Sequence, residues 1–142
     1  MHSYSIKIKP RYAETDQMGV VYHGNYFPWF ELGRDDFFHK LGCCYKSVEN
    51  CGIIMPVTRC DCQYIVSATY DEMIDVQTTL LFFNGVRLKL KFDVFREADQ
   101  TLLAKATIEY AFLNTESKPI NLKKINNDIW QRIDAEYKIS VK

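Results

Sequence analysis

The segment 25–41 constrains the fold more than any other part of the chain. Its pattern predicts a helix, with Asn25 as the N-cap, Pro28 in the first turn and Gly42 as the stop. Apolar side chains cover most of its circumference: Tyr26, Phe27, Trp29, Phe30, Leu32, Phe37, Phe38 and Leu41. The polar stripe is narrow and consists of Glu31, Asp35 and His39, with Arg34 beside it. A helix of this kind must be buried on several sides, and a sheet wrapped around it would bury it.

The rest of the chain is dominated by predicted strands. Alternation and apolar runs predict strands at 4–10, 53–66, 74–83, 86–96 and 101–114. Asn84-Gly85 favours a hairpin turn because both residues accept a positive φ, and a second turn is expected at 97–100. A short helical turn is expected at 47–51, and an amphipathic C-terminal helix is marked by Leu122, Ile125, Ile129, Trp130 and Ile133.

This order of elements predicts an α+β fold, with residues 1–142 forming one domain. An antiparallel five-stranded sheet would wrap around one long buried helix. One sheet cannot enclose the helix and also hide its own edges. We therefore expect two sheets to pair edge to edge in a homo-oligomer, either a homodimer or a homotetramer.

Composition excludes several classes of protein. The 18 basic and 18 acidic residues give a formal net charge of zero, which argues against a nucleic-acid binder. No secretory signal or membrane-spanning run is evident, so a cytoplasmic location is expected. The cysteines are expected to be reduced and buried, and their spacing predicts no metal site: Cys43, Cys44, Cys51, Cys60 and Cys62.

The loop before the long helix contains the candidate chemistry. Its candidate acid is Asp16, which is followed by Gly19. A carboxylate beside a helix N-terminus suits acyl transfer. The carboxylate can attack the acyl carbonyl carbon itself or deprotonate a water molecule, while the free N–H groups of the helix hold the developing oxyanion. The alternative is a structural role in which Asp16 caps a turn or pairs with Arg11.

The motif around Asp16 and the order of elements resemble those of the hotdog-fold thioesterases. The subgroup that fits is the hydroxybenzoyl-CoA thioesterase-like acyl-CoA thioesterases, including the type encoded beside bacterial Tol–Pal genes. The resemblance rests on Thr15-Asp16-x-x-Gly19-Val20-Val21-Tyr22-His23-x-Asn25-Tyr26, then Trp29-Phe30-Glu31 and Arg34, and on the weaker landmark Ala68-Thr69-Tyr70-Asp71-Glu72.

The resemblance implies hydrolysis of acyl-CoA to free acid and CoA, without a metal or cofactor. Asp16 matches the catalytic aspartate, and the backbone N–H of His23 matches the donor that polarises the thioester carbonyl. The catalytic motif also includes Tyr22, and the residues expected to bind substrate are Gly19, Asn25, Glu31, Arg87 and Lys89. The last two would lie near the CoA nucleotide. The acyl chain could be aryl, short and branched, or longer, and acyl carrier protein could replace CoA.

Other interpretations of the same residues stay open. Glu31 could be the catalytic carboxylate, or it could form a salt bridge with Arg34, with Arg11 or with a partner subunit. The His23 side chain could act as an acid or base, and with Glu31 it would suit a hotdog hydratase or dehydratase. A third possibility is a module that binds an acyl-pantetheine arm without cleaving it. A cysteine nucleophile at Cys60 or Cys62 is disfavoured, because neither lies in a strand–turn–helix elbow.

Overall fold

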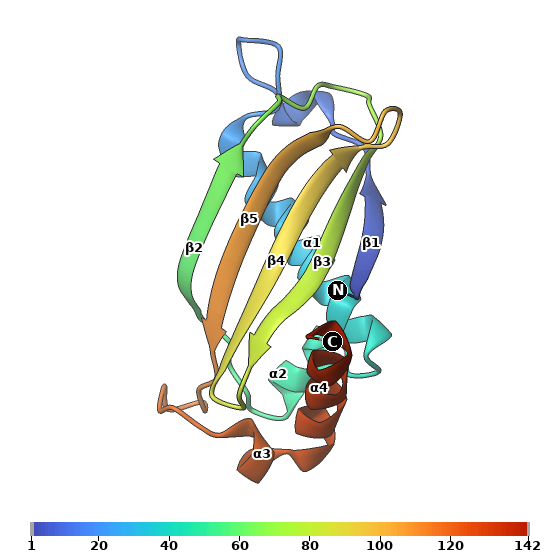
Figure 1. Cartoon of the computed structure of the whole chain (residues 1–142). Coiled ribbons are helices and arrows are strands. Elements are labelled where there is room, and N and C mark those ends of the chain that lie inside the picture. Colours follow the sequence, from blue (N-terminus) through green and yellow to red (C-terminus); the bar gives the residue numbers. More distant parts are fainter. Residues whose placement is uncertain (1, 142) are drawn as a thin grey trace.

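Helix α1 (Tyr26–Lys40) runs behind a five-stranded antiparallel sheet in the computed structural model, which describes residues 2–141 (Figure 1). The sheet order is β1-β3-β4-β5-β2, so that β1 and β2 form its two edges. The strands are β1 (Ser3–Ile8), β2 (Val57–Tyr64), β3 (Ile74–Phe83), β4 (Arg87–Arg96) and β5 (Leu102–Ala111). This is the predicted α+β architecture.

The core lies between α1 and the inner face of the sheet. The helix buries Tyr26, Trp29, Phe30, Gly33, Phe37 and Phe38. The ring of Phe30 stacks on Phe92 of β4, with 5.0 Å between their centroids. Gly33 allows the helix to approach closely, since a Cβ there would lie 2.7 Å from Thr78 Oγ1 of β3. In the single chain the opposite stripe of α1 is exposed, and it includes Leu32, which is 52% exposed.

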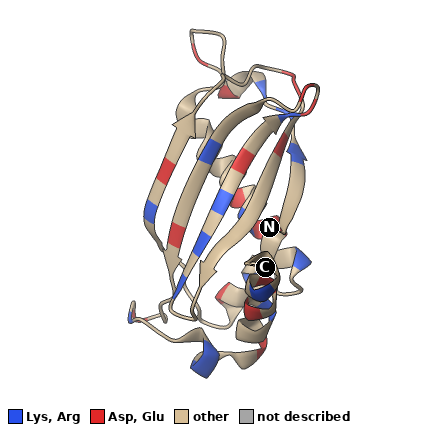
Figure 2. Cartoon of the chain, in the orientation of Figure 1, with Lys and Arg blue, Asp and Glu red and all other residues tan. Residues whose placement is uncertain are grey.

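The two faces of the sheet differ in polarity, because successive side chains of a strand point to opposite faces. Along β4, Leu88, Leu90, Phe92 and Val94 are buried, and Lys89, Lys91 and Asp93 alternate with them. Basic and acidic side chains are interspersed on β2, β4 and β5 (Figure 2). Some of these side chains form ion pairs: Lys89 with Glu109 at 3.7 Å, and Lys91 with Asp93 at 3.3 Å. The outer face of the sheet is therefore polar.

The remaining helices are α2 (Tyr45–Asn50), α3 (Leu122–Ile125) and α4 (Asn127–Ser140). Helix α4 packs along β3, where Ser140 Oγ donates to the carbonyl of Leu80 at 2.8 Å. Its buried Glu136 accepts a hydrogen bond from the Tyr4 hydroxyl at 3.0 Å and lies 2.7 Å from His2 Nδ1. These bonds join the C-terminal helix to β1.

Most predicted elements differ from the observed ones by a few residues at their ends, and two of them differ in a way that has a clear physical reason. The strand expected at 53–66 begins only at Val57, because Pro56 has no N–H to donate to a ladder. Ile54 still forms an isolated bridge with Leu113. The expected C-terminal helix is two helices separated at Asn126, whose backbone is extended and whose side chain caps α4 by accepting from the N–H of Ile129 at 3.1 Å.

The described residues bear on two further predictions. None of the helices within residues 2–141 is long and apolar enough to cross a bilayer. All five thiols are free, but only Cys43 is buried, whereas Cys51 and Cys60 are exposed. The prediction that the cysteines are buried is therefore wrong for most of them.

Candidate active site

The loop that contains Asp16 is closed by its own backbone. The N–H of Asp16 donates to the carbonyl of Val20 at 2.9 Å, and the N–H of Gly19 donates to the carbonyl of Asp16 at 3.0 Å. Gly19 has φ +78°, a conformation that favours glycine. Asp16 Oδ1 accepts from the N–H of Met18 at 2.8 Å. Asp16 therefore caps the turn, as the structural alternative proposed, but only with one carboxylate oxygen; no residue within 2–141 donates to Oδ2.

Glu14 anchors this loop, a role that the sequence analysis missed. Its side chain is 12% exposed and accepts from the N–H of Arg11 at 2.8 Å and from Trp29 Nε1 at 3.1 Å. Its carbonyl accepts from the N–H of Tyr22 at 2.8 Å and from Asn25 Nδ2 at 2.8 Å. The available signal was its position three residues after Arg11, from which a carboxylate can reach back to a free N–H.

The entry to α1 is a 3₁₀ turn, His23–Asn25. Asn25 occupies the predicted N-cap position of α1, but its side chain does not cap the helix, because that amide is bonded to the Glu14 carbonyl. The first N–H groups of a helical turn have no partner within it. Accordingly, no described residue accepts a hydrogen bond from the N–H of His23 or of Gly24. Such groups carry partial positive charge and suit a developing oxyanion.

A cavity of about 180 Å³ lies beside the loop and the helix entry. Its lining consists of Asp16, Met18, Val20, Val21, His23, Tyr26, Tyr64, Ile65, Val66 and Ser67. Most of these side chains are apolar, with an acid and a helix-entry residue among them, as in sites that hold an apolar group and act on one polar bond. The structure thus brings together two of the predicted site residues, Asp16 and His23.

Other predicted site residues lie outside the lining of this cavity. Tyr22 is exposed, and its ring packs beside that of His23 with 4.4 Å between centroids. Glu31 is exposed on α1. Arg34, which could have paired with it, bonds to Asp35 at 3.0 Å and lies 3.9 Å over the ring of Tyr45.

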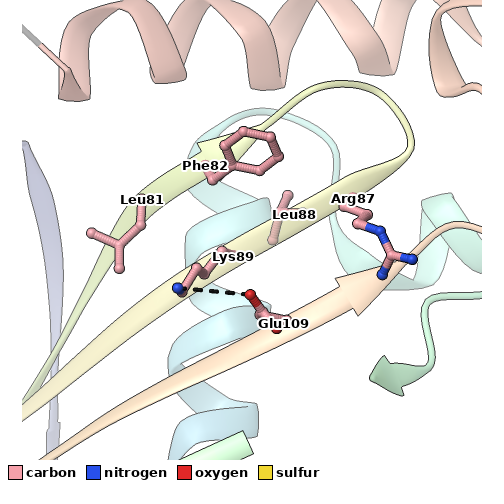
Figure 3. A pocket seen from close by; sticks show the side chains of 6 residues that line it. All are labelled: Leu81, Phe82, Arg87, Leu88, Lys89 and Glu109. Atoms are coloured by element: carbon pink, nitrogen blue, oxygen red, sulfur yellow. Dashed lines mark ion pairs between the residues drawn. The ribbon is translucent and has the colours of Figure 1, made fainter. Parts of the chain in front are cut away.

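Arg87 and Lys89 lie towards the other end of the sheet. Lys89 is in register with Glu109 and, across β5, with Arg59 of β2, whereas Tyr64 at the cavity is five positions further along β2. At about 3.3 Å per residue the two rows are separated by roughly 17 Å. A separate pocket of about 400 Å³ lies there, lined by Leu81, Phe82, Arg87, Leu88, Lys89 and Glu109 (Figure 3). Within one chain, these cations and Asp16 therefore belong to different sites.

A sheet wrapped around one long helix, with an acid and free helix-entry N–H groups at one cavity, defines the hotdog class of thioester hydrolases. The chain belongs to the Thioesterase-like superfamily, which matches residues 10–133. This confirms the resemblance found in the sequence.

Three relatives illustrate the similarity. The Bacillus subtilis protein named "Putative acyl-CoA thioesterase YneP" is 37% identical over 125 residues, which cover 87% of this chain and 90% of that protein. The acyl-CoA thioesterase YbgC of Haemophilus influenzae is 26% identical over the same shares of the two chains. The crystal structure of the DHNA-CoA thioesterase of Staphylococcus aureus matches with a TM-score of 0.88 and 36% identity, covering 95% of this chain and 93% of that one.

Proposed function

We propose that the protein hydrolyses acyl-CoA thioesters to a free acid and CoA, with Asp16 as the catalytic carboxylate. The observation that carries the proposal is that, among the described residues, nothing donates to one oxygen of Asp16 and nothing accepts from the N–H groups of the neighbouring helix entry. The names of the relatives from Bacillus subtilis and Staphylococcus aureus support CoA thioesters as the substrate class.

Two routes fit this arrangement. As a general base, Asp16 takes a proton from water, the hydroxide attacks the carbonyl carbon, and the tetrahedral oxyanion is held by the N–H of His23. The intermediate collapses to the acid, and the proton passes to the departing CoA thiolate. As a nucleophile, Asp16 displaces the thiolate and forms an anhydride, which water then cleaves. A thiolate leaves readily, so neither route requires a strong acid.

We further propose that two copies of the chain complete the substrate site. The edge strand β2 is exposed along almost its whole length, and exposed apolar side chains lie at its two ends and just beyond them: Ile54, Val57, Tyr64, Ile65 and Val66. Such an edge favours pairing with another strand. Antiparallel pairing of two β2 strands about a twofold axis would bring the start of one strand beside the end of the other.

That pairing would connect the two separated groups of predicted residues. The end of β2 at Tyr64, next to Asp16, would face the start of the second copy's β2, which lies in register with Lys89. Arg87 and Lys89 of the second copy would then be available for the phosphates of CoA, as guanidinium and ammonium groups commonly are. We accordingly propose a homodimer, or a homotetramer built from it, in which each nucleotide lies on the neighbouring subunit.

Aryl-CoA is the first acyl class to test. The rings of His23, Tyr26 and Tyr64 form much of the cavity wall, and those of Tyr26 and Tyr64 meet edge to face at 5.0 Å. The likeness to a DHNA-CoA thioesterase also favours an aromatic acyl group. The free state of the five cysteines is consistent with a reducing compartment, and we propose that the enzyme acts in the cytoplasm.

The experiment that tests this function is thiol release from a panel of aryl-, branched- and linear acyl-CoAs, and from acyl carrier protein loaded with the same groups. Release of CoA thiol is the expected result. With an enoyl-CoA added to the panel, loss of enoyl absorbance without thiol release would instead show a hydratase. Binding of an acyl-pantetheine with neither change would show a non-catalytic module.

A further inference from the structure

Tyr64, the last residue of β2, holds the peptide at the entry of α1. Its hydroxyl donates to the carbonyl of His23 at 2.9 Å. Its ring packs edge to face on Tyr26 at 5.0 Å and on His23 at 6.0 Å, and it forms part of the cavity wall. The edge strand of the sheet is thereby bonded directly to the helix-entry turn.

The carbonyl that Tyr64 holds belongs to the same planar unit as the N–H of Gly24. A second donor, the N–H of Tyr26, also bonds the carbonyl of His23. The preceding carbonyl, that of Tyr22, accepts from the N–H of Asn25 at 2.9 Å. Because a peptide is planar, fixing its carbonyl fixes the direction of the N–H on its other side. Hydrogen bonding at the carbonyl also polarises the N–H and makes it a better donor.

We propose that Tyr64 is a positioning residue for the reaction, which orients the N–H of Gly24 towards the thioester oxygen through its bond to the His23 carbonyl. This proposal rests on the proposed thioesterase function. The Gly24 N–H would then be a second donor to the oxyanion, beside the N–H of His23. Tyr64 acts through the turn and not by attacking or protonating the substrate.

The chemistry of the hydroxyl supports this role. Partial burial raises the pKa of Tyr64 above its ordinary value, and the neighbouring Cys62 thiol raises it further. The phenol therefore keeps its proton at neutral pH and can act as a donor. Gly24 also fits the turn, because a Cβ there would lie 2.8 Å from Cε2 of the Tyr22 ring.

The first test compares Tyr64→Phe with Tyr4→Phe in the thiol-release assay. Each change removes one hydroxyl that donates to an oxygen, and Tyr4 lies on β1, the opposite edge strand of the sheet, where it bonds Glu136 of α4. Because the lost bond acts mainly on the orientation of the oxyanion donors, we expect kcat to fall about tenfold in Tyr64→Phe with KM within about twofold. Tyr4→Phe should retain wild-type kcat. An unchanged kcat in Tyr64→Phe, a rise in KM alone, or an equal loss in Tyr4→Phe would overturn the proposal.

The second test does not require turnover. The Gly24 amide resonance of ¹⁵N-labelled protein should shift in Tyr64→Phe and stay in place in Tyr4→Phe, because hydrogen bonding at a carbonyl polarises the N–H of the same peptide. An unmoved Gly24 resonance would refute the positioning role. If the wild type released no thiol from any acyl-CoA, the proposed function would fail, and the Gly24 resonance alone would decide whether Tyr64 orients this turn.

Discussion

The indole Nε1 of Trp29 donates to Oε2 of Glu14 at 3.1 Å, and this bond joins helix α1 to the loop that carries Asp16. The two residues are fifteen positions apart, yet the same glutamate also accepts the N–H of Arg11 and, through its carbonyl, the N–H of Tyr22. The segment on each side of Asp16 therefore has its position fixed by one largely buried residue.

Replacing Glu14 with alanine should impair catalysis without removing any group that touches substrate. The indole N–H of Trp29 and the N–H of Arg11 would lose their acceptor, and the loop would lose its anchor to α1. A misplaced catalytic group is costly, so we expect kcat in thiol release to fall by about tenfold or more. Glu116→Ala, an exposed acid in a remote loop, is the matched control. Equal activity in the two variants would show that Glu14 does not position Asp16.

Asp16→Asn and Glu31→Gln together identify the catalytic carboxylate. Each substitution removes a charge and keeps the shape of the side chain. We expect Asp16→Asn to lose at least about a thousandfold in kcat/KM, the scale expected for a central catalytic group. Glu31 is exposed on α1 and does not line the cavity with Asp16, so Glu31→Gln should change kcat/KM far less. The reverse ranking would move the catalytic role to Glu31.

The features that the sequence predicted correctly depend on local patterns. The long helix and the hairpin at Asn84-Gly85 follow from apolar spacing and turn chemistry, and Gly85 indeed has φ +88°. The motif around Asp16 was informative because a short loop and the helix entry that follows it are adjacent in space as well as in sequence. That is why Asp16 and His23 share a cavity.

The errors have a common physical origin in competition for hydrogen bonds. Asn25 stands at the predicted N-cap position, but its amide is bonded to the Glu14 carbonyl instead of capping α1, and that bond exists only because the loop folds back on the helix. Asn126 caps a helix that the apolar spacing had treated as continuous. The role of Glu14 as the anchor of the loop depends on its hydrogen bond with Trp29, and no local sequence pattern connects these two residues.

Gly33→Ala should destabilise the fold although alanine is the better helix former. The new Cβ would lie 2.7 Å from Thr78 Oγ1 and 3.4 Å from Phe92 and Val76, so helix and sheet would have to separate. Overpacking of this kind typically costs about 1 to 3 kcal/mol, which exceeds the gain of about 1 kcal/mol in helix propensity. Urea unfolding measures the net loss. In a Thr78→Ala background the same change should cost less, and an equal cost in both backgrounds would rule out this contact as the cause.

Cys44 should react with iodoacetamide at lower pH than its neighbour Cys43. The hydroxyl of Ser47 lies 3.0 Å from the Cys44 sulfur, and this bond, with the Ser47 N–H, lowers the pKa of Cys44. Burial raises the pKa of Cys43 to about 11. Only the thiolate reacts with iodoacetamide. A lowered pKa therefore makes the reaction rate rise at lower pH, and a raised pKa shifts that rise to higher pH. Peptide mapping across neutral and mildly alkaline pH would measure both rates.

Ser47→Ala is the control for that experiment. Without the hydroxyl, the pKa of Cys44 should rise and its rate profile should move to higher pH, while the profile of Cys43 stays in place. Faster labelling of Cys43 than of Cys44 in the wild type, or a Cys44 profile unaffected by Ser47→Ala, would contradict the assignment.

Arg87→Ala should weaken binding of the nucleotide part of CoA and leave the chemical step intact. Arg87 and Lys89 line a pocket with the apolar Leu81 and Phe82, which suits a phosphate beside a flat base (Figure 3). Because the cation is exposed, we expect KM for acyl-CoA to rise by about fivefold, the upper range for a surface ion pair, with kcat unchanged. Acyl-pantetheine lacks the nucleotide, so its KM should not respond. Lys138→Ala removes a cation from α4, where Lys138 pairs with Asp134 at 3.0 Å, and should leave both KM values as they are. If Arg87→Ala raised KM equally for acyl-CoA and acyl-pantetheine, the nucleotide would have to bind elsewhere.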